Sequence, residues 1–214
     1  MSTGINNPLN VLIINASNRP KGNSHLLMEK AVNEISKYSD TVFETYEIYN
    51  KNFGRFDPEK DTKELIEKWD RADTILLFIP NYTVGGPGSL YSAFERLAQH
   101  YEEDIKNGVY KKTAGVLVQG SAKYGMAELA MESTFQMLVG IHTIPIYRLV
   151  AHIPDGTGPD EELLKGVETM VKESVLGGKL FKLSTKEDVK GNAEILVVNA
   201  GFDNEDIGEE IEKR

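Results

Sequence analysis

The feature that most constrains the fold is a regular alternation between short apolar runs and longer stretches in which apolar residues recur at helical spacing. Five short runs each predict a strand, and the second alternates as an edge strand does. These expected strands are residues 11–15, 42–48, 74–79, 114–119 and 143–149. Strands that alternate with helices pair in parallel, which predicts an α/β sheet covered by helices on both faces.

The expected helices determine how the chain returns between strands. The first helix follows Gly22, and Asn23 or Ser24 can serve as its N-cap. The other expected helices are residues 62–71, the segment around 90–97, 127–140 and 161–183. Right-handed crossovers favour a doubly wound sheet of strand order 2-1-3-4-5, which binds ligands beyond the carboxyl ends of its strands. The loops 16–24, 80–88 and 120–125 are therefore expected to form one site.

The length of the chain predicts one domain with an extension. A chain of 214 residues, 40% of them apolar and 27% charged, is sufficient for a single α/β core. Residues 1–184 are expected to form this domain. Residues 185–214 are expected to be a C-terminal extension, with one strand candidate at 195–198 and an acidic tail from 203 onward.

Composition excludes several classes of function. The chain contains no cysteine, so a thiolate nucleophile, a dithiol pair or a cysteine-bound iron–sulfur cluster is excluded, and redox chemistry would need a bound cofactor. A formal charge of −9 disfavours nucleic acid as a partner. No apolar run is long enough to span a membrane and no signal segment is visible, so we expect a cytoplasmic protein. His100, His142 and His152 lack the spacing of metal ligands.

The first loop has the composition of a phosphate site. Ser17, Arg19, Asn23 and Ser24 supply hydroxyl, amide and guanidinium donors beside a helix N-terminus, and Gly22 permits close approach of the backbone. Neither the nucleoside-triphosphatase loop nor the Gly-x-Gly-x-x-Gly dinucleotide pattern is present, which favours a terminal phosphate over the pyrophosphate of a dinucleotide. The alternative is an ordinary turn followed by a helix cap.

Three loops in order resemble those of the NADPH-dependent FMN reductase family, which includes quinone and azo reductases and iron–sulfur flavoproteins. The first is Ser-Asn-Arg-Pro-Lys-Gly-Asn-Ser at 17–24, and the second is Ile-Pro-Asn-Tyr-Thr-Val-Gly-Gly-Pro-Gly at 79–88. The third is Gln-Gly-Ser-Ala-Lys-Tyr-Gly at 119–125. The resemblance covers residues 9–183. The absence of cysteine departs from the cluster-bearing branch, and the Gly-Gly pair at 85–86 departs from a loop with side chains there.

The resemblance implies a flavodoxin-like fold with bound FMN. Ser17, Arg19, Asn23 and Ser24 would hold the phosphate. The isoalloxazine ring would lie between two loops, formed by Pro80, Asn81, Tyr82, Thr83 and Val84 on one side and by Gly120, Ser121, Ala122, Tyr124 and Gly125 on the other. Tyr82 offers an aromatic face, and loop amides can hydrogen-bond the ring edge.

The function that follows is an FMN-dependent NAD(P)H oxidoreductase, in which hydride passes through the flavin to a quinone, an azo compound or free flavin. No protein acid or base is required, so no catalytic residue is predicted. The resemblance also implies a homodimer or homotetramer, with 90–99 and 192–200 near the contact. The alternatives are an FMN-binding electron carrier or redox sensor, and an interaction module without flavin. Arg19 favours the reductase, because carrier loops resemble a hydroxyl-rich pattern without arginine.

Three further features carry weaker expectations. His25 follows the phosphate loop, but a single histidine in a first helical turn is usually only a surface residue. The segment 155–160 follows the fifth strand and is a lid candidate, although such a sequence more often forms a surface turn. Trp69 belongs to a helical apolar stripe and is expected in the core.

Overall fold

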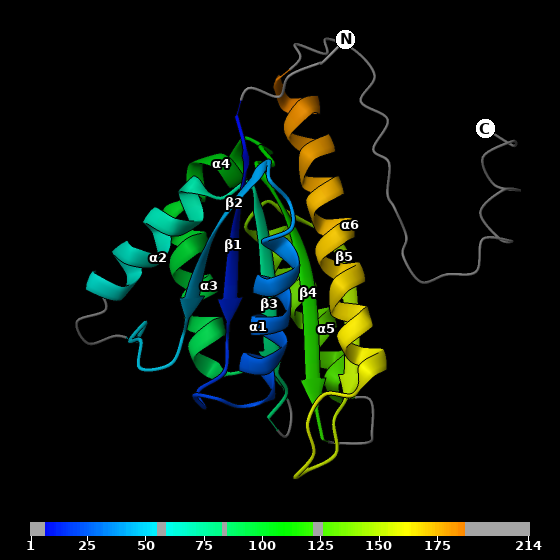
Figure 1. Ribbon diagram of the computed structural model, residues 1–214. Helices are drawn as coiled ribbons and strands as arrows, with labels where there is room; N and C mark the ends of the chain where they lie inside the picture. Colours follow the sequence, from blue (N-terminus) through cyan, green and yellow to red (C-terminus); the bar gives the residue numbers. More distant parts are fainter. Residues whose placement is uncertain (1–6, 55–58, 83–84, 122–125, 187–214) are drawn as a thin grey trace, which may run out of the picture.

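The computed structural model of the chain describes residues 7–54, 59–82, 85–121 and 126–186 (Figure 1). These residues contain a five-stranded, fully parallel sheet of order β2-β1-β3-β4-β5. Its strands are β1 (Leu9–Asn15), β2 (Thr41–Glu47), β3 (Thr74–Pro80), β4 (Lys112–Gly120) and β5 (Thr143–His152). The predicted fold class and strand order are confirmed.

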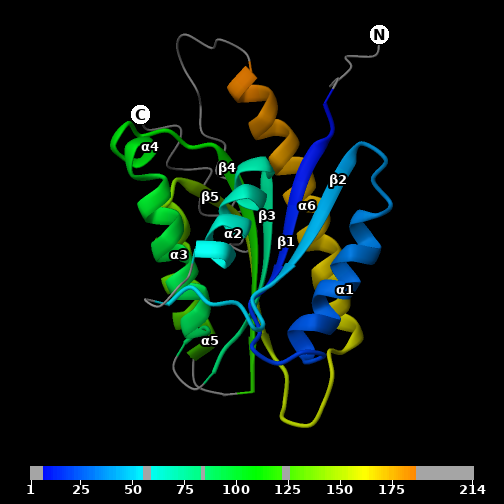
Figure 2. The same cartoon turned by 90° about the vertical axis from the view of Figure 1, so that its left-hand side faces the viewer.

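Helices cover both faces of the sheet. They are α1 (Asn23–Ile35), α2 (Glu59–Arg71), α3 (Gly88–His100), α4 (Glu102–Lys106), α5 (Met126–Gly140) and α6 (Glu161–Lys186). Figure 2 shows α1 and α6 on one side of the sheet and α2, α3 and α5 on the other. Because both faces are covered, every residue of β3 and β4 is buried. Within the described ranges, no helix is long and apolar enough to cross a membrane.

The ends of several elements differ from the sequence expectation. Helix α2 begins at Glu59 instead of residue 62, and its first turn contains two acidic residues, which favour the positive end of a helix dipole. Strand β2 lies one residue earlier than 42–48, and it is an edge strand as expected. The short helix α4 was not expected, because its acidic residues show no apolar stripe. The strand candidate at 195–198 and the acidic tail lie outside the described residues.

Glycines in α6 and β4 allow the helix to lie directly on the sheet. A Cβ atom at Gly178 would lie 2.0 Å from Thr74 Oγ1 in β3, and one at Gly115 would lie 2.2 Å from Ser174 Oγ in α6. No side chain fits in either gap. On the opposite face Trp69 is 1% exposed and meets Phe94 edge to face, so its expected place in the core is confirmed.

Backbone hydrogen bonds hold the loops at the carboxyl edge of the sheet close together. The Ala16 N–H donates to the Phe78 carbonyl at 2.9 Å, and the Asn81 N–H donates to the Gln119 carbonyl at 2.6 Å. The Ile153 N–H donates to the Gly120 carbonyl at 3.0 Å. The loops after β1, β3, β4 and β5 therefore meet at one edge, toward which the strand arrows of Figure 1 point.

At the opposite edge, Lys112 is a buried cation that the sequence did not reveal. It is 6% exposed, and its Nζ donates to the carbonyls of Ala72 at 2.7 Å and Asp70 at 3.2 Å. Burial lowers the pKa of Lys112 to about 8, because desolvation disfavours the charged form. The folded chain therefore releases this proton at a lower pH than the unfolded chain does.

We expect this difference to appear in the pH dependence of stability. Between about pH 8 and 10.5 the unfolded chain binds the Lys112 proton and the folded chain does not, so stability rises with pH. The free energy of unfolding of the wild type, relative to Lys112→Met, should rise across this window by about 2–3 kcal/mol in urea titrations. Lys111→Met is the control, since Lys111 is half-exposed and pairs with Asp104. Parallel curves for the wild type and Lys112→Met would contradict the expectation.

Candidate functional site

The first loop presents the start of α1 to the carboxyl edge of the sheet. Lys21 adopts a left-handed backbone conformation with φ of 60°, and Gly22 is the extended N-cap residue. Helix α1 begins without a side-chain cap and without an acidic residue in its first turn. The first N–H groups of a helix need acceptors, and the helix dipole favours an anion among them. The loop therefore offers an anion site.

The predicted cap by Asn23 or Ser24 is wrong. The Asn23 amide donates instead to the Thr157 carbonyl at 3.4 Å, in the loop after β5. The Ser24 hydroxyl is buried and accepts a hydrogen bond from Gln119 Nε2 at 3.1 Å. A side chain from the end of β4 thus competes for the hydroxyl, and the helix amides stay available to a ligand.

The loop is braced by its own side chains. The Asn15 side-chain oxygen accepts from the Ser17 N–H at 3.0 Å, and Ser17 Oγ accepts from the Arg19 N–H at 3.0 Å. The same hydroxyl donates to the Arg19 carbonyl at 3.1 Å. These short-range bonds define a turn that directs Arg19 toward the space above the strand ends.

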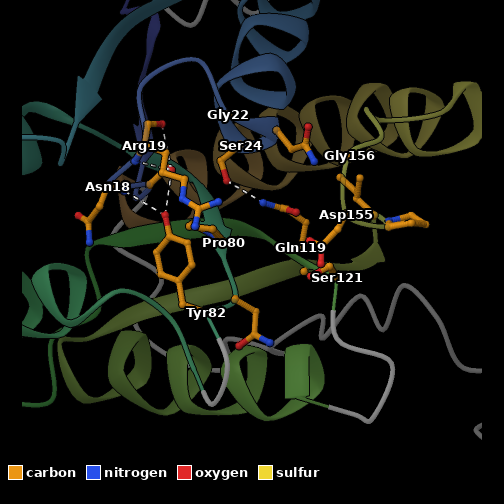
Figure 3. A pocket seen from close by; sticks show the side chains of 16 residues that line it. Asn18, Arg19, Gly22, Ser24, Pro80, Tyr82, Gln119, Ser121, Asp155 and Gly156 are labelled. Atoms are coloured by element: carbon orange, nitrogen blue, oxygen red, sulfur yellow. Dashed lines mark hydrogen bonds between the residues drawn. The ribbon is translucent and has the colours of Figure 1, made fainter.

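Tyr82 connects the second loop to the first. Its hydroxyl lies 3.2 Å from Ser17 Oγ and accepts from the Asn18 N–H at 3.3 Å. The Arg19 guanidinium lies 5.7 Å from the centre of the Tyr82 ring, within range of a cation–π contact. Figure 3 shows Tyr82 standing beneath the Arg19 loop at one side of the pocket. Loops 65 residues apart in sequence are thus joined through one phenol.

These groups line a polar cleft of about 720 Å³. The structure brings the following predicted residues together around it: Ser17, Arg19, Asn23, Ser24, Pro80, Asn81, Tyr82, Gly120 and Ser121. The other predicted contacts, Thr83, Val84, Ala122, Tyr124 and Gly125, lie outside the described residues. The volume is that of a small-molecule or cofactor site.

The loop after β5 forms a wall of the cleft that was underestimated from the sequence. Ile153, Pro154, Asp155 and Gly156 line the cleft. Figure 3 shows Asp155 and Gly156 on the side opposite Tyr82. The available signal was its position after a fifth parallel strand, since all strand ends meet at this edge. Asn18, Gly22 and Gln119 also line the cleft and were not predicted as ligands.

His25 lies apart from the cleft. It is not among the lining residues, and its ring pairs with Glu47 at 2.9 Å and with Glu29 at 3.4 Å. Across the described part of the chain, no three histidine, aspartate or glutamate side chains are grouped as metal ligands.

The lining fits a ligand with an anionic end. Arg19 and Asp155 are the charged residues among the described lining, and Arg19 shares the cleft with Gly22, the N-cap residue of α1. Asn81 is 8% exposed, and both polar atoms of its side chain lack a hydrogen-bond partner among the described residues. Unpaired buried amides are costly, which makes Asn81 stand out among the residues that line the cleft. A Cβ at Gly120 would lie 3.0 Å from Asn81 Cβ, so a larger residue at position 120 would displace Asn81.

This fold and this anion site define a flavodoxin-like α/β protein with a nucleotide cleft at the carboxyl edge of its sheet. The family model of NADPH-dependent FMN reductases matches residues 9–157. The chain therefore belongs to the NADPH-dependent FMN reductase family. FMN is its cofactor, and its activity is FMN-dependent oxidoreduction.

Solved structures agree in fold at low sequence identity. The apo form of an NADH:FMN oxidoreductase, EMOB, is 15% identical with a TM-score of 0.64, over 79% of this chain and 89% of its own. The NAD(P)H:acceptor oxidoreductase FerB of Paracoccus denitrificans is 20% identical with a TM-score of 0.61, over 81% and 98%. The Streptococcus pneumonia TIGR4 flavodoxin is 14% identical with a TM-score of 0.55, over 79% and 99%. No curated protein matches the chain.

We expect Arg19→Ala to weaken FMN binding far more than riboflavin binding, because only FMN carries the phosphate that Arg19 would pair with. Loss of a charge-assisted contact should cost FMN about 10- to 100-fold in affinity and leave riboflavin within about threefold. Quenching of flavin fluorescence on titration of the apo-protein measures both constants. Equal losses for the two ligands would place Arg19 away from the phosphate.

We expect Asn81→Leu to separate ligand binding from stability. The amide makes no hydrogen bond with the described residues, so the urea midpoint of the apo-protein should stay the same or rise. If Asn81 serves the flavin ring, FMN and riboflavin should both bind roughly 3- to 10-fold more weakly, by the loss of one hydrogen bond. Lower stability with unchanged flavin affinity would show that Asn81 has a structural role instead.

Proposed function

We propose that this chain is an NAD(P)H oxidoreductase that passes reducing equivalents from NADH or NADPH through FMN to a small acceptor such as a quinone, an azo compound or free flavin. The observation that carries the proposal is the first loop, in which Arg19 lines the same cleft as Gly22 and Ser24 at the uncapped N-terminus of α1. That arrangement suits a terminal phosphate monoester, since amides, dipole and guanidinium all favour the same dianion.

In this proposal the protein binds and orients, and the bound FMN supplies the hydride and electron transfer chemistry. Ser17, Arg19, Asn23 and Ser24 hold the phosphate end. Asn81 and the backbone around Gly120 hold the ring, with the loops described above on either side. Tyr82 lies between these two parts of the site because its hydroxyl meets Ser17 and Asn18.

Composition leaves bound FMN as the redox centre of the proposed reaction. The chain has no cysteine, so it holds no thiol relay or cysteine-bound cluster. Electrons would then arrive on a nicotinamide and leave on a second small molecule at the same open cleft. Asp155, at the rim of the cleft, would disfavour strongly anionic acceptors and leave neutral ones preferred.

The setting and assembly are part of the same proposal. A nicotinamide donor suits the cytoplasm. Assembly as a homodimer or homotetramer is supported by apolar side chains on α6, where Leu176, Leu180 and Leu183 are 50%, 56% and 43% exposed. Exposed apolar groups at successive turns of one helix are a feature of interaction surfaces.

We expect the protein purified with FMN to be yellow and to lose its flavin absorbance directly when NADH or NADPH is added without oxygen. Addition of a small quinone should then restore the absorbance, because the reduced cofactor is reoxidised. Stopped-flow absorbance measures both half-reactions, and riboflavin-loaded protein shows whether the phosphate site is needed. Failure of both nucleotides to bleach a bound flavin that dithionite does bleach would favour the electron carrier.

A further inference from the structure

We propose that Tyr91 and Ser89, on the first two turns of α3, are positioning residues that hold the two flavin-binding loops in a fixed relation to each other. Neither residue lines the cleft. Each is connected to a loop that does, by a side-chain hydrogen bond. The inference rests on the proposed function, because it assigns these loops to the phosphate and the ring of FMN.

The Tyr91 hydroxyl holds Gly86 in the second loop. It accepts a hydrogen bond from the Gly86 N–H at 3.0 Å. The neighbouring Gly85 is joined to Tyr82 by two backbone bonds, with the Tyr82 N–H donating at 2.8 Å and the Gly85 N–H at 3.3 Å. One side chain of α3 thereby fixes the end of the segment that starts at the cleft-lining Tyr82.

The Gly-Gly pair is explained by the same hydroxyl. A Cβ atom at Gly85 would lie 3.3 Å from Tyr91 Oη, and one at Gly86 would lie 3.3 Å from the same atom and 3.2 Å from Ile79 Cγ2. All three distances are tighter than an ordinary van der Waals contact. The pair therefore leaves space for the phenol, and the phenol in turn restrains Gly86.

Ser89 makes the corresponding contact with the first loop. Its Oγ donates to Asn18 Oδ1 at 3.0 Å. The Asn18 N–H in turn donates to the Tyr82 hydroxyl at 3.3 Å. These hydrogen bonds connect α3 and the two loops to one another. Ser89 joins α3 to the first loop, and Tyr82 joins the first loop to the second. Gly86 and Tyr91 then join the second loop to α3.

Helix α3 is a suitable support because its inner face is fixed in the core. Leu90, Ala93, Phe94 and Leu97 are at most 3% exposed. Side chains on an anchored helix hold a binding geometry more closely than loop residues do. Tyr91 and Ser89 thus hold both loops of the flavin site in a fixed position relative to the core.

The two residues should affect different parts of the ligand. Tyr91 supports the loop that flanks the ring, which FMN and riboflavin share, so Tyr91→Phe should weaken both ligands by the same factor of roughly 3 to 10. Ser89 supports the phosphate loop, so Ser89→Ala should weaken FMN by a similar factor and riboflavin by less than about twofold. A residue that only stabilised the fold would not separate the ligands in this way.

Fluorescence titrations of FMN and riboflavin into each apo-protein measure these constants, with urea unfolding of the same samples. Tyr110→Phe and Ser133→Ala are matched controls, because Tyr110 stacks on His142 away from the cleft and the Ser133 hydroxyl donates to the Leu129 carbonyl of its own helix. Both controls should bind as the wild type does. Unchanged constants for Tyr91→Phe and Ser89→Ala, in a wild type that binds FMN, would overturn the positioning proposal alone. A wild type that binds no flavin would overturn the proposed function.

A double-mutant cycle tests the contact between the hydroxyl and the glycine. Gly85→Ala should displace the Tyr91 hydroxyl and weaken both ligands about as much as Tyr91→Phe does. In the Tyr91→Phe background the same substitution should have little further effect, because the crowded atom is gone. Additive losses would show that Gly85 and Tyr91 act independently and would overturn the proposal, even if Tyr91→Phe alone lowered both affinity and stability.

Discussion

The parallel pairing of β1 with β3 is the constraint on which the rest of the site depends. Asn15, the last residue of β1, lies opposite Phe78, and the Ala16 N–H continues the ladder one residue beyond it. Because helices leave these two neighbouring strands toward opposite faces of the sheet, their loops diverge and leave a gap between them. The loops after β1 and β3 border this gap, so strand order brings Ser17 next to Tyr82.

The first loop favours an anion although the net charge of the whole chain is negative. A net charge of −9 would repel an anion at long range, but salt screens such repulsion beyond roughly 10 Å. Close to α1 the helix dipole, the uncapped amides and Arg19 all favour a bound anion. Asp155 opposes them from the other wall. An acidic protein can therefore keep an anion site, because contact distances decide its strength.

The strands and the three loops could be predicted from the sequence because apolar spacing and strand polarity are local signals. The hydrogen-bond partner of Ser24 could not be predicted, because Gln119 is 95 residues away and the two meet only in the folded sheet. The same reason hid the burial of Lys112 and the contact of Ser89 with Asn18. The wall at Ile153–Gly156 was visible as a position but had no distinctive residue pattern. Local chemistry thus predicts where a site lies, and long-range contacts determine its details.

The glycines at positions 177 and 178 affect the order in which the chain folds as it is synthesised. Two adjacent glycines lower the intrinsic helix propensity of α6 by about 1 kcal/mol each, so this part of the helix depends on the sheet for its stability. The sheet depends on it in return, since Gly178 lies against Thr74 of β3 and Leu9 of β1. The part of β1 and β3 that packs on α6 is thus covered only when α6, the last described helix, has left the ribosome as far as Gly178. A nascent chain therefore completes this side of its sheet late, after residue 178 is available.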